Sequence, residues 1–348
     1  MAHTFLRKKI AHVDLRNISS IDDLITAFSG SSFQSRNLAK CVDTFVTMLT
    51  DEERPTVFLG LAGAMVPAGM KKVISYMVIK NMIDVVVSTG ANMYHDVVEA
   101  LGGHHYQGSI DIDDRILYEH SIDRIYDVFA NEKKYRDVDN EIMALADEAA
   151  QSSTTMSSRR FLSLLGEYID HSPSTSDKEG SIVWNCWKYQ VPIFVPALND
   201  SSIGLGITQH YVKYLQKGLT PLAIDAIRDN YEIFQIKKAA KKTGVIYVGG
   251  GVPKNYIQQT AYLQDLFGLP DSGHDYGVQL TTDRPEWGGL SGATFKEGLS
   301  WGKERPQGMY ATCYCDATIS LPILVKAALE RIPSDTLRTT RLNFQFAP

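Results

Sequence analysis

The amino-acid sequence predicts an α/β fold in which a parallel sheet carries helices on both faces. Short apolar runs recur along the chain, and each is followed, after a loop, by sequence of helical character. The runs are almost continuously apolar rather than alternating, which is typical of parallel strands that are covered on both sides. Polar and glycine-rich turns follow the runs, as expected where strands pass into helices at one edge of such a sheet.

The first strand is expected at residues 55–61, a β-branched apolar run. A helix over 69–81 and a second strand over 83–90 complete a strand, helix, strand unit. The same alternation continues through apolar runs at 192–198, 244–248 and 276–282. A last strand, 308–315, leads into a helix that begins at about Asp316, whose carboxylate is expected to cap that helix.

A chain of 348 residues, of which 44% are hydrophobic and 22% charged, can bury a large core. We expect a single domain over residues 1–348. The polar stretches 151–159 and 171–180 are typical of excursions between helices, or of a mobile loop, rather than of a boundary between two cores. Together they predict one polar excursion around 151–180.

The charge and cysteine patterns exclude several classes of function. The formal net charge is -5 and the basic residues are scattered, so neither nucleic acid nor an anionic membrane is an expected partner. Residues 1–10 lack the apolar core of a signal peptide, and no later run approaches the ~18 apolar residues of a membrane span. The cysteines show neither zinc-site nor disulfide spacing, and no metal site is predicted. A cytoplasmic enzyme is expected.

The turns that follow the strands contain most of the candidate ligand contacts. Gly249, Gly250 and Gly251 come directly after a strand, where glycine lets the backbone approach a phosphate closely. This is not the G-x-G-x-x-G pattern, so an ordinary glycine-rich turn is the alternative. Asp200 and Asp316 also follow strands, where a carboxylate could bind ribose hydroxyls; a helix cap or a turn aspartate is the alternative for each.

A second cluster of candidate residues consists of Glu297, Trp301 and Lys303. Because residues 297 and 301 are four apart, a helix here would place the carboxylate and the indole on one face. A carboxylate beside an aromatic ring suits a cationic amine. The alternative, which spacing alone favours, is an exposed Glu297 and Lys303 around a buried Trp301.

Several motifs in combination resemble the deoxyhypusine synthase family, in the same order along the chain over roughly residues 35–335. They are Thr89-Gly90-Ala91-Asn92, Pro196-Ala197-Leu198-Asn199-Asp200, Gly249-Gly250-Gly251-Val252-Pro253-Lys254, Ser300-Trp301-Gly302-Lys303 and Cys315-Asp316-Ala317. The segment 286–294 is similar to the prokaryotic branch that is called deoxyhypusine synthase-like. The resemblance implies a Rossmann-like NAD-binding fold and a homotetramer whose sites lie between paired subunits.

The resemblance also implies a reaction of polyamine metabolism. In the family, NAD takes a hydride from spermidine, 1,3-diaminopropane leaves, and the lysine that matches Lys303 holds the butyl fragment as an imine until an acceptor amine displaces it. The expected catalytic residues are Lys303, Glu297 and Trp301, and burial beside Trp301 is expected to favour the neutral, nucleophilic form of Lys303. The expected NAD contacts are Thr89, Gly90, Asp200, Gly250, Gly251, Thr282, Gly288, Asp316 and Ala317.

Six positions depart from the family pattern, and two of them, Gly63 and Ala64, replace polar residues on the dinucleotide side. Leu205 and Leu290 stand where the eukaryotic enzymes have aspartates for the spermidine amines, and Asn255 replaces a histidine that helps to orient the substrate. Each lost carboxylate removes a charge-assisted hydrogen bond to an ammonium group. His95 occupies the place of a NAD-contacting glutamate, so NAD is expected to bind with altered contacts.

Three functional hypotheses remain open. The first is an NAD-dependent aminoalkyl transferase with a free diamine as acceptor, a homospermidine synthase-type enzyme. The second is a deoxyhypusine synthase that modifies a lysine of a translation initiation factor, and the altered polyamine pocket argues against it. The third is a non-catalytic protein that binds NAD or a polyamine, against which the joint presence of Lys303, Trp301 and Glu297 argues.

Overall fold

The structure, a computed structural model, describes residues 7–270, 272–333 and 336–346, so both ends of the predicted domain 1–348 lie outside the described residues. The helices and strands, with η for 3-10 helices, are η1 (Leu15–Asn17), α2 (Ile21–Ser29), α3 (Phe33–Thr50), β1 (Thr56–Leu61), α4 (Lys71–Ile79), β2 (Val85–Ser88), α5 (Gly90–Ala100), β3 (His105–Gln107), α6 (Asp114–Glu119), β4 (Ile122–Ile125), β5 (Val128–Asn131), α7 (Glu132–Ser152), β6 (Thr155–Met156), α8 (Ser158–His171), α9 (Ile182–Lys188), β7 (Ile193–Phe194), α10 (Ser202–Gln216), β8 (Ala223–Ile224), α11 (Ala226–Ala239), β9 (Thr243–Val248), α12 (Gly251–Leu266), β10 (His274–Thr281), η2 (Pro285–Trp287), α13 (Phe295–Ser300), β11 (Glu304–Tyr314) and α14 (Ala317–Arg331).

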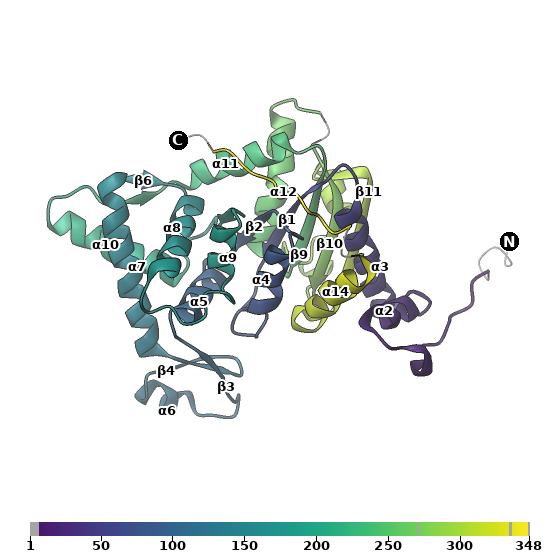
Figure 1. Ribbon diagram of the computed structural model, residues 1–348, viewed down its shortest axis with the longest axis horizontal. Helices are drawn as coiled ribbons and strands as arrows, with labels where there is room; N and C mark the ends of the chain where they lie inside the picture. The colour runs from purple at the N-terminus through teal and green to yellow at the C-terminus, as the bar shows by residue number, and fades with distance from the viewer. Residues whose placement is uncertain (1–6, 271, 334–335, 347–348) are drawn as a thin grey trace.

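Six strands form one parallel sheet in the order β11-β10-β9-β1-β2-β7 (Figure 1). The central strand β1 pairs with β2 on one side and with β9 on the other, so Leu59 lies between Val86 and Ile246. The chain first extends the sheet through β2 and β7, and then crosses over to add β9, β10 and β11. This arrangement confirms the predicted α/β class with a parallel sheet.

Helices cover both faces of the sheet. Successive residues of a strand point to opposite faces, so a continuously apolar strand presents apolar side chains on both. On one face, Val57, Leu59 and Leu61 of β1 join a large apolar core with residues of α3, α4, α5 and α14. On the other face, Phe58 joins a smaller core with residues of α11, α12 and α13. Both α12 and α13, which carry candidate site residues, therefore lie on the second face.

Several predicted strand boundaries are wrong. The run 192–198 forms a strand only at Ile193–Phe194, because prolines flank it and proline has no N–H for a sheet. The last strand begins at Glu304 rather than at 308, with an irregular register against the start of β10. The antiparallel sheet β3-β5-β4, which projects with α6 in Figure 1, was not predicted, because its strands have at most four residues and no continuous apolar run.

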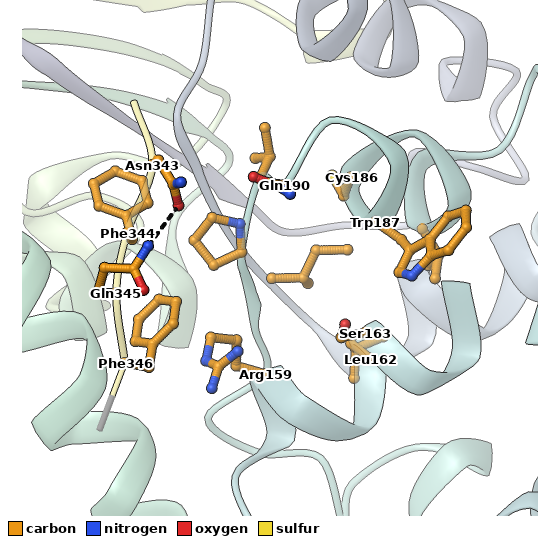
Figure 2. A pocket seen from close by; sticks show the side chains of 14 residues that line it. Arg159, Leu162, Ser163, Cys186, Trp187, Gln190, Asn343, Phe344, Gln345 and Phe346 are labelled. Carbon is orange, nitrogen blue, oxygen red and sulfur yellow. Dashed lines mark hydrogen bonds between the residues drawn. The ribbon is translucent and has the colours of Figure 1, made fainter. Parts of the chain in front are cut away.

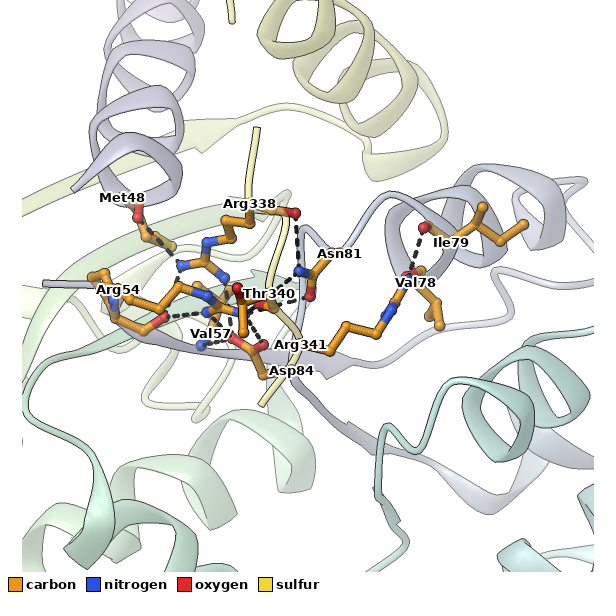
Figure 3. A network of polar contacts seen from close by, with 11 residues as sticks. Met48, Arg54, Val57, Val78, Ile79, Asn81, Asp84, Arg338, Thr340 and Arg341 are labelled. Carbon is orange, nitrogen blue, oxygen red and sulfur yellow. Dashed lines mark hydrogen bonds and ion pairs between the residues drawn. The ribbon is translucent and has the colours of Figure 1, made fainter. Parts of the chain in front are cut away.

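The C-terminal residues 336–346 lie against the amino ends of β1 and β2, and the buried Arg338 holds them there through hydrogen bonds to Asp84 and to the carbonyl of Pro55 (Figure 3). The side chains of Arg338 and Asp84 are each 2% exposed, and an Arg338 N–H donates to Asp84 over 3.0 Å. Asp84 also accepts from Arg54 over 2.6 Å and from the backbone N–H of Val57 over 2.8 Å. Burial lowers the pKa of Arg338 to about 10, against the favourable charge of Asp84. The chain itself thus covers this edge of the sheet.

The predicted polar excursion around 151–180 contains β6, helix α8 and most of the loop that leads to α9. The single domain stays a prediction. Within residues 7–270, 272–333 and 336–346, no helix is both long and apolar enough to cross a membrane.

Candidate site at the carboxyl edge of the sheet and its flank

The order of the strands predicts a ligand crevice at the carboxyl edge of the sheet. The chain leaves β1 toward β2 on one side and later returns to β9 on the other, so the carboxyl ends at Leu61 and Val248 form a switch point. In open parallel sheets, ligands bind at such a point, where the helices that follow the strands offer free backbone N–H groups. The predicted glycine turn 249–251 follows β9 directly at this point.

The glycine turn 249–251 has a conformation that requires glycine. Gly249 and Gly251 have positive φ angles of 71° and 55°, which disfavour a side chain. Gly250 is extended, but a Cβ there would collide with the backbone of Ser291. The Gly251 N–H donates to Ser291 Oγ over 2.9 Å, and the 16-residue helix α12 begins at the same glycine. The turn therefore places the start of a long helix at the crevice, as a phosphate site requires.

Gln279 and Lys254, which sequence reasoning did not select as site residues, hold this turn in place. Gln279 is 1% exposed within β10, and its Nε2 donates to the carbonyls of Gly249 over 2.9 Å and of Ser291 over 2.8 Å. The Lys254 ammonium, also 1% exposed, donates to Gln279 Oε1 over 3.0 Å and to the Ala293 carbonyl. Burial lowers the pKa of Lys254 to about 8. The signal for Gln279 was a polar residue inside an apolar strand.

On the other side of the crevice, Thr89 and Gly90 follow β2 at the start of α5. A Cβ on Gly90 would collide with Ser201, so the loop after β7 packs directly against this turn. That loop carries Asp200, which is exposed and does not cap α10, because Ser201 is the N-cap residue. Thr89 Oγ1 accepts a hydrogen bond from Asn92 Nδ2 over 3.1 Å. The structure thus brings Thr89, Gly90 and Asp200 to one edge.

The remaining predicted dinucleotide contacts follow β10 and β11. Thr282 comes directly after β10 and is exposed, and Gly288 ends η2 with a φ angle of 72°. Asp316 caps α14, which begins at Ala317, and its Oδ1 accepts the N–H of Thr318 over 2.7 Å. The predicted cap is confirmed. The exposed Asp316 carboxylate still has a second oxygen that faces no part of this cap, so a ligand contact is compatible with capping.

A cavity of about 590 Å³ borders Asp316 and is also lined by His105 of β3. His105 Nε2 lies 3.1 Å from His95 Nδ1, and His105 Nδ1 lies 2.6 Å from Glu99. Burial lowers the pKa of His95 to about 4, so this imidazole is neutral at physiological pH. A neutral His95 carries no charge to replace that of the glutamate that the sequence resemblance led us to expect at this place.

Lys303 lies at the amino end of β11, beside the start of β10, rather than at the carboxyl edge of the sheet. Its ammonium donates to Asn255 Oδ1 over 3.3 Å and lies 5.7 Å from the centre of the Trp301 ring. Asn255 belongs to the first turns of α12, the helix that begins at the glycine turn. One helix therefore links the predicted lysine to the predicted dinucleotide turn.

The surroundings of Lys303 are more open than expected. Glu297 in α13 is exposed, and Trp301 follows the end of that helix with 61% of its surface exposed. The expectation that Lys303 is buried beside Trp301 is therefore wrong for a single chain, in which Lys303 is half-buried. Leu205 and Leu290, which the sequence resemblance places at the positions of two aspartates, are 57% and 45% exposed. In one chain alone, the apolar side chains of Trp301, Leu205 and Leu290 are therefore open to solvent.

A separate cavity of about 440 Å³ lies against the C-terminal residues (Figure 2). Its lining includes Trp187, Phe344 and Phe346, and the Arg159 guanidinium lies 3.8 Å from the centre of the Phe346 ring. The predicted site residues, all of which are described, do not line this cavity. Within the described part of the chain, no group of three or more His, Cys, Asp or Glu residues is arranged to hold a metal ion.

Comparisons with known proteins find relatives over most of the chain. The family model described as deoxyhypusine synthase matches residues 23–328. "Probable deoxyhypusine synthase 2" of Methanosarcina acetivorans is 46% identical over 329 residues, which cover 94% of this chain and 92% of the relative. The "Deoxyhypusine synthase-like protein" of Coxiella burnetii is 37% identical, with 94% of this chain and 90% of the relative covered. A crystal structure assigned as a deoxyhypusine synthase, from Entamoeba histolytica, superposes with a TM-score of 0.60 at 18% identity; 97% of this chain and 100% of that chain are covered, which supports the fold alone.

Proposed function

Because the chain belongs to the deoxyhypusine synthase family of NAD-dependent aminobutyl transferases, we propose that it transfers an aminoalkyl group through an imine on Lys303 to a free diamine. This is a homospermidine synthase-type reaction of polyamine metabolism in the cytoplasm. The observation that carries the proposal is the hydrogen bond of 3.3 Å from Lys303 to Asn255. It matters because α12 joins that lysine to the glycine turn at the crevice. Membership of an enzyme family sets aside the hypothesis of a non-catalytic binding protein.

The residues at the carboxyl edge fit NAD. Gly250 and Gly251 would receive the pyrophosphate at the start of α12, where the turn lacks side chains; the ligand would take the place of Ser291 Oγ, which accepts the Gly251 N–H in this structure. Asp200 and Asp316 would bind ribose hydroxyls. The other proposed contacts are Thr89, Gly90, Thr282, Gly288 and Ala317. Held by these residues, NAD would supply the hydride-accepting and hydride-donating chemistry that the transfer requires.

Lys303 would act as the nucleophile. Its neutral amine attacks the carbon of the oxidised donor, the bond from that carbon to the departing amine breaks, and the alkyl fragment stays on Lys303 as an imine. One proton passes from the lysine nitrogen to the departing amine, so the charge balances. Asn255 would aim the amine by accepting its N–H. The Trp301 ring and the Glu297 carboxylate would hold the cationic end of the fragment.

The identity of the acceptor separates two candidate functions. Leu205 and Leu290 cannot hold ammonium groups as aspartates do, so the amine substrates must be fixed differently from spermidine in the eukaryotic enzymes. This altered pocket favours the free diamine. The second candidate is transfer to a lysine of a translation initiation factor, and the name of the Methanosarcina acetivorans relative favours it.

We also propose that a second copy of the chain completes the site within a homotetramer. Large apolar side chains are exposed in the segments that carry the site, among them Trp287 at 70%, Trp301 at 61% and Leu290 at 45%. Exposed apolar surface of this kind marks an interaction site. Cover by another subunit would keep water from the Lys303 imine.

Identification of the product tests the proposed acceptor. Purified protein, NAD and spermidine are incubated with putrescine, and separately with the translation initiation factor; parallel reactions use agmatine as the donor. We expect homospermidine and 1,3-diaminopropane with spermidine and putrescine, and no change in the mass of the factor. A factor that gains an aminobutyl group, without any homospermidine, would establish the second candidate instead. No transfer to either acceptor would contradict both.

A further inference from the structure

A surface loop, residues 285–291, lies on the proposed pyrophosphate site. Residues 285–290 are all exposed, whereas Ser291 at the end of the loop is half-buried against the glycine turn. The ends of the loop lie close together, because a Cβ on Gly292 would come within 2.2 Å of the Arg284 carbonyl oxygen. A compact loop whose ends lie side by side can move as one unit.

Ser291 ties the 285–291 loop to the glycine turn through two hydrogen bonds. Its Oγ accepts the Gly251 N–H over 2.9 Å, and its carbonyl accepts from Gln279 Nε2 over 2.8 Å. The same Gln279 Nε2 donates to the carbonyl of Gly249 over 2.9 Å, so one buried amide group holds both the loop and the turn. The packing is equally close, since a Cβ on Gly250 would come within 2.4 Å of the Ser291 Cα.

A pyrophosphate and Ser291, as it stands here, cannot share this site. The Ser291 hydroxyl lies where a phosphate oxygen would accept the Gly251 N–H. Rotation of the hydroxyl does not clear the position, because the Ser291 Cβ is one covalent bond from it, whereas non-bonded atoms are most stable roughly 3.5 Å apart. The backbone of Ser291 must therefore move away from the turn, and its hydrogen bond with Gln279 must lengthen or break. Entry of the pyrophosphate displaces the loop.

We propose that Ser291 is a positioning residue that holds the 285–291 loop on the pyrophosphate site until NAD binds and releases it. Leu290, the position at which the sequence resemblance expects an anchor for the amine, precedes Ser291 in the same loop. Release of the loop moves this position as NAD enters, so the binding of NAD and the binding of the amine are coupled. The inference rests on the proposed NAD site at Gly250 and Gly251.

The affinity for ADP-ribose tests the release of the loop. This probe has the pyrophosphate of NAD but no nicotinamide to accept a hydride, so no reaction follows binding. Calorimetry compares the full-length parent with Ser291→Ala, which loses the hydroxyl, and Ser291→Thr, which keeps it. Ser29→Ala, an exposed change on α2, is the matched control.

We expect Ser291→Ala to bind ADP-ribose about three- to tenfold more tightly than the parent, because one hydrogen bond no longer has to break. Ser291→Thr and Ser29→Ala should match the parent. Equal or weaker binding by Ser291→Ala would overturn the proposal. Gly250→Ala does not mimic the released loop, because its methyl group itself fills the space between the turn and the loop.

The coupling to the amine is measured separately. The affinity for spermidine is determined with and without saturating ADP-ribose. We expect the two values to differ by about fivefold or more in the parent, and by less in Ser291→Ala, in which the loop is already loosened. Equal affinities in the parent would contradict the coupling.

The pattern of results separates this inference from the proposed function. A parent that binds no ADP-ribose would remove the NAD site, and the role of Ser291 with it. Neither measurement involves hydride transfer or an imine on Lys303, so a failure of the proposed transfer leaves both results readable.

Discussion

Replacing Lys254 with methionine should change how the free energy of unfolding depends on pH. The Lys254 side chain is 1% exposed, and burial lowers its pKa from 10.5 to about 8. Between these two values Lys254 is neutral in the folded protein but protonated in the unfolded chain. Stability rises with pH wherever the unfolded chain binds more protons. The parent should therefore gain stability from this group as the pH rises from about 8 towards 10.5, and have none of that gain below pH 8.

The size of the effect follows from the two pKa values and the contacts of the ammonium. The difference between 10.5 and about 8 corresponds to about 3 kcal/mol, at ~1.4 kcal/mol per pKa unit. Lys254→Met removes this gain. At pH 7 the variant also loses hydrogen bonds to Gln279 and Ala293, at ~1.5–3 kcal/mol each, but no longer buries a charge. These effects oppose each other, so we expect a small difference in stability at pH 7 and a parent more stable by ~2–3 kcal/mol at pH 10.

Urea unfolding at fixed protein concentration, repeated between pH 7 and pH 10, measures this difference. Lys296→Met, an exposed change on α13, is the matched control and should follow the parent at every pH. A gap between the parent and Lys254→Met that stays constant over this range would refute the reasoning, because the lysine would then titrate alike in the folded and unfolded states.

Asp84→Ala should destabilise the protein by about 3–5 kcal/mol in urea unfolding, because Arg338 is left buried without its ion-pair partner. A loss of about 1 kcal/mol, typical of an exposed pair, would contradict the account of the C-terminal residues. Gly250→Ala should weaken NAD binding by about tenfold or more in calorimetry, since the new methyl group displaces Ser291 from the turn, at a cost of at least ~1.4 kcal/mol. Unchanged affinity would remove this turn from the NAD site. Leu290→Asp should lower the KM for spermidine by about tenfold with a smaller effect on kcat, because it restores an anionic anchor. A KM that does not fall would show that position 290 does not face the amine.

The sheet and the glycine turn at its carboxyl edge could be predicted from the sequence because their signals are local. The strands Thr56–Leu61 and Thr243–Val248 are fully buried, and full burial requires the continuous apolar runs that the sequence shows. The cap at Asp316 is equally local, since it depends on one carboxylate before a helix. The glycine turn 249–251 was placed correctly for the same reason.

The polar groups behind the turn could not be predicted, because their burial depends on packing between distant segments. Lys254 becomes buried only where Gln279 of β10 and the carbonyl of Ala293 meet α12. Glu304 is buried because Gly298 leaves space for its carboxylate. The exposure of Trp301 was not predicted either. The sequence resemblance implied that Trp301 and Lys303 are enclosed, and one chain alone does not enclose them.

Covalent trapping tests the central claim, that Lys303 carries the transferred fragment as an imine. The protein is incubated with NAD and spermidine, reduced with borohydride, digested and analysed by mass spectrometry. We predict an aminobutyl adduct on Lys303 that requires NAD, is absent in Lys303→Arg and persists in Lys296→Arg, its exposed neighbour on α13. An adduct on another lysine, or no adduct with spermidine, any other polyamine or agmatine, would contradict the claim.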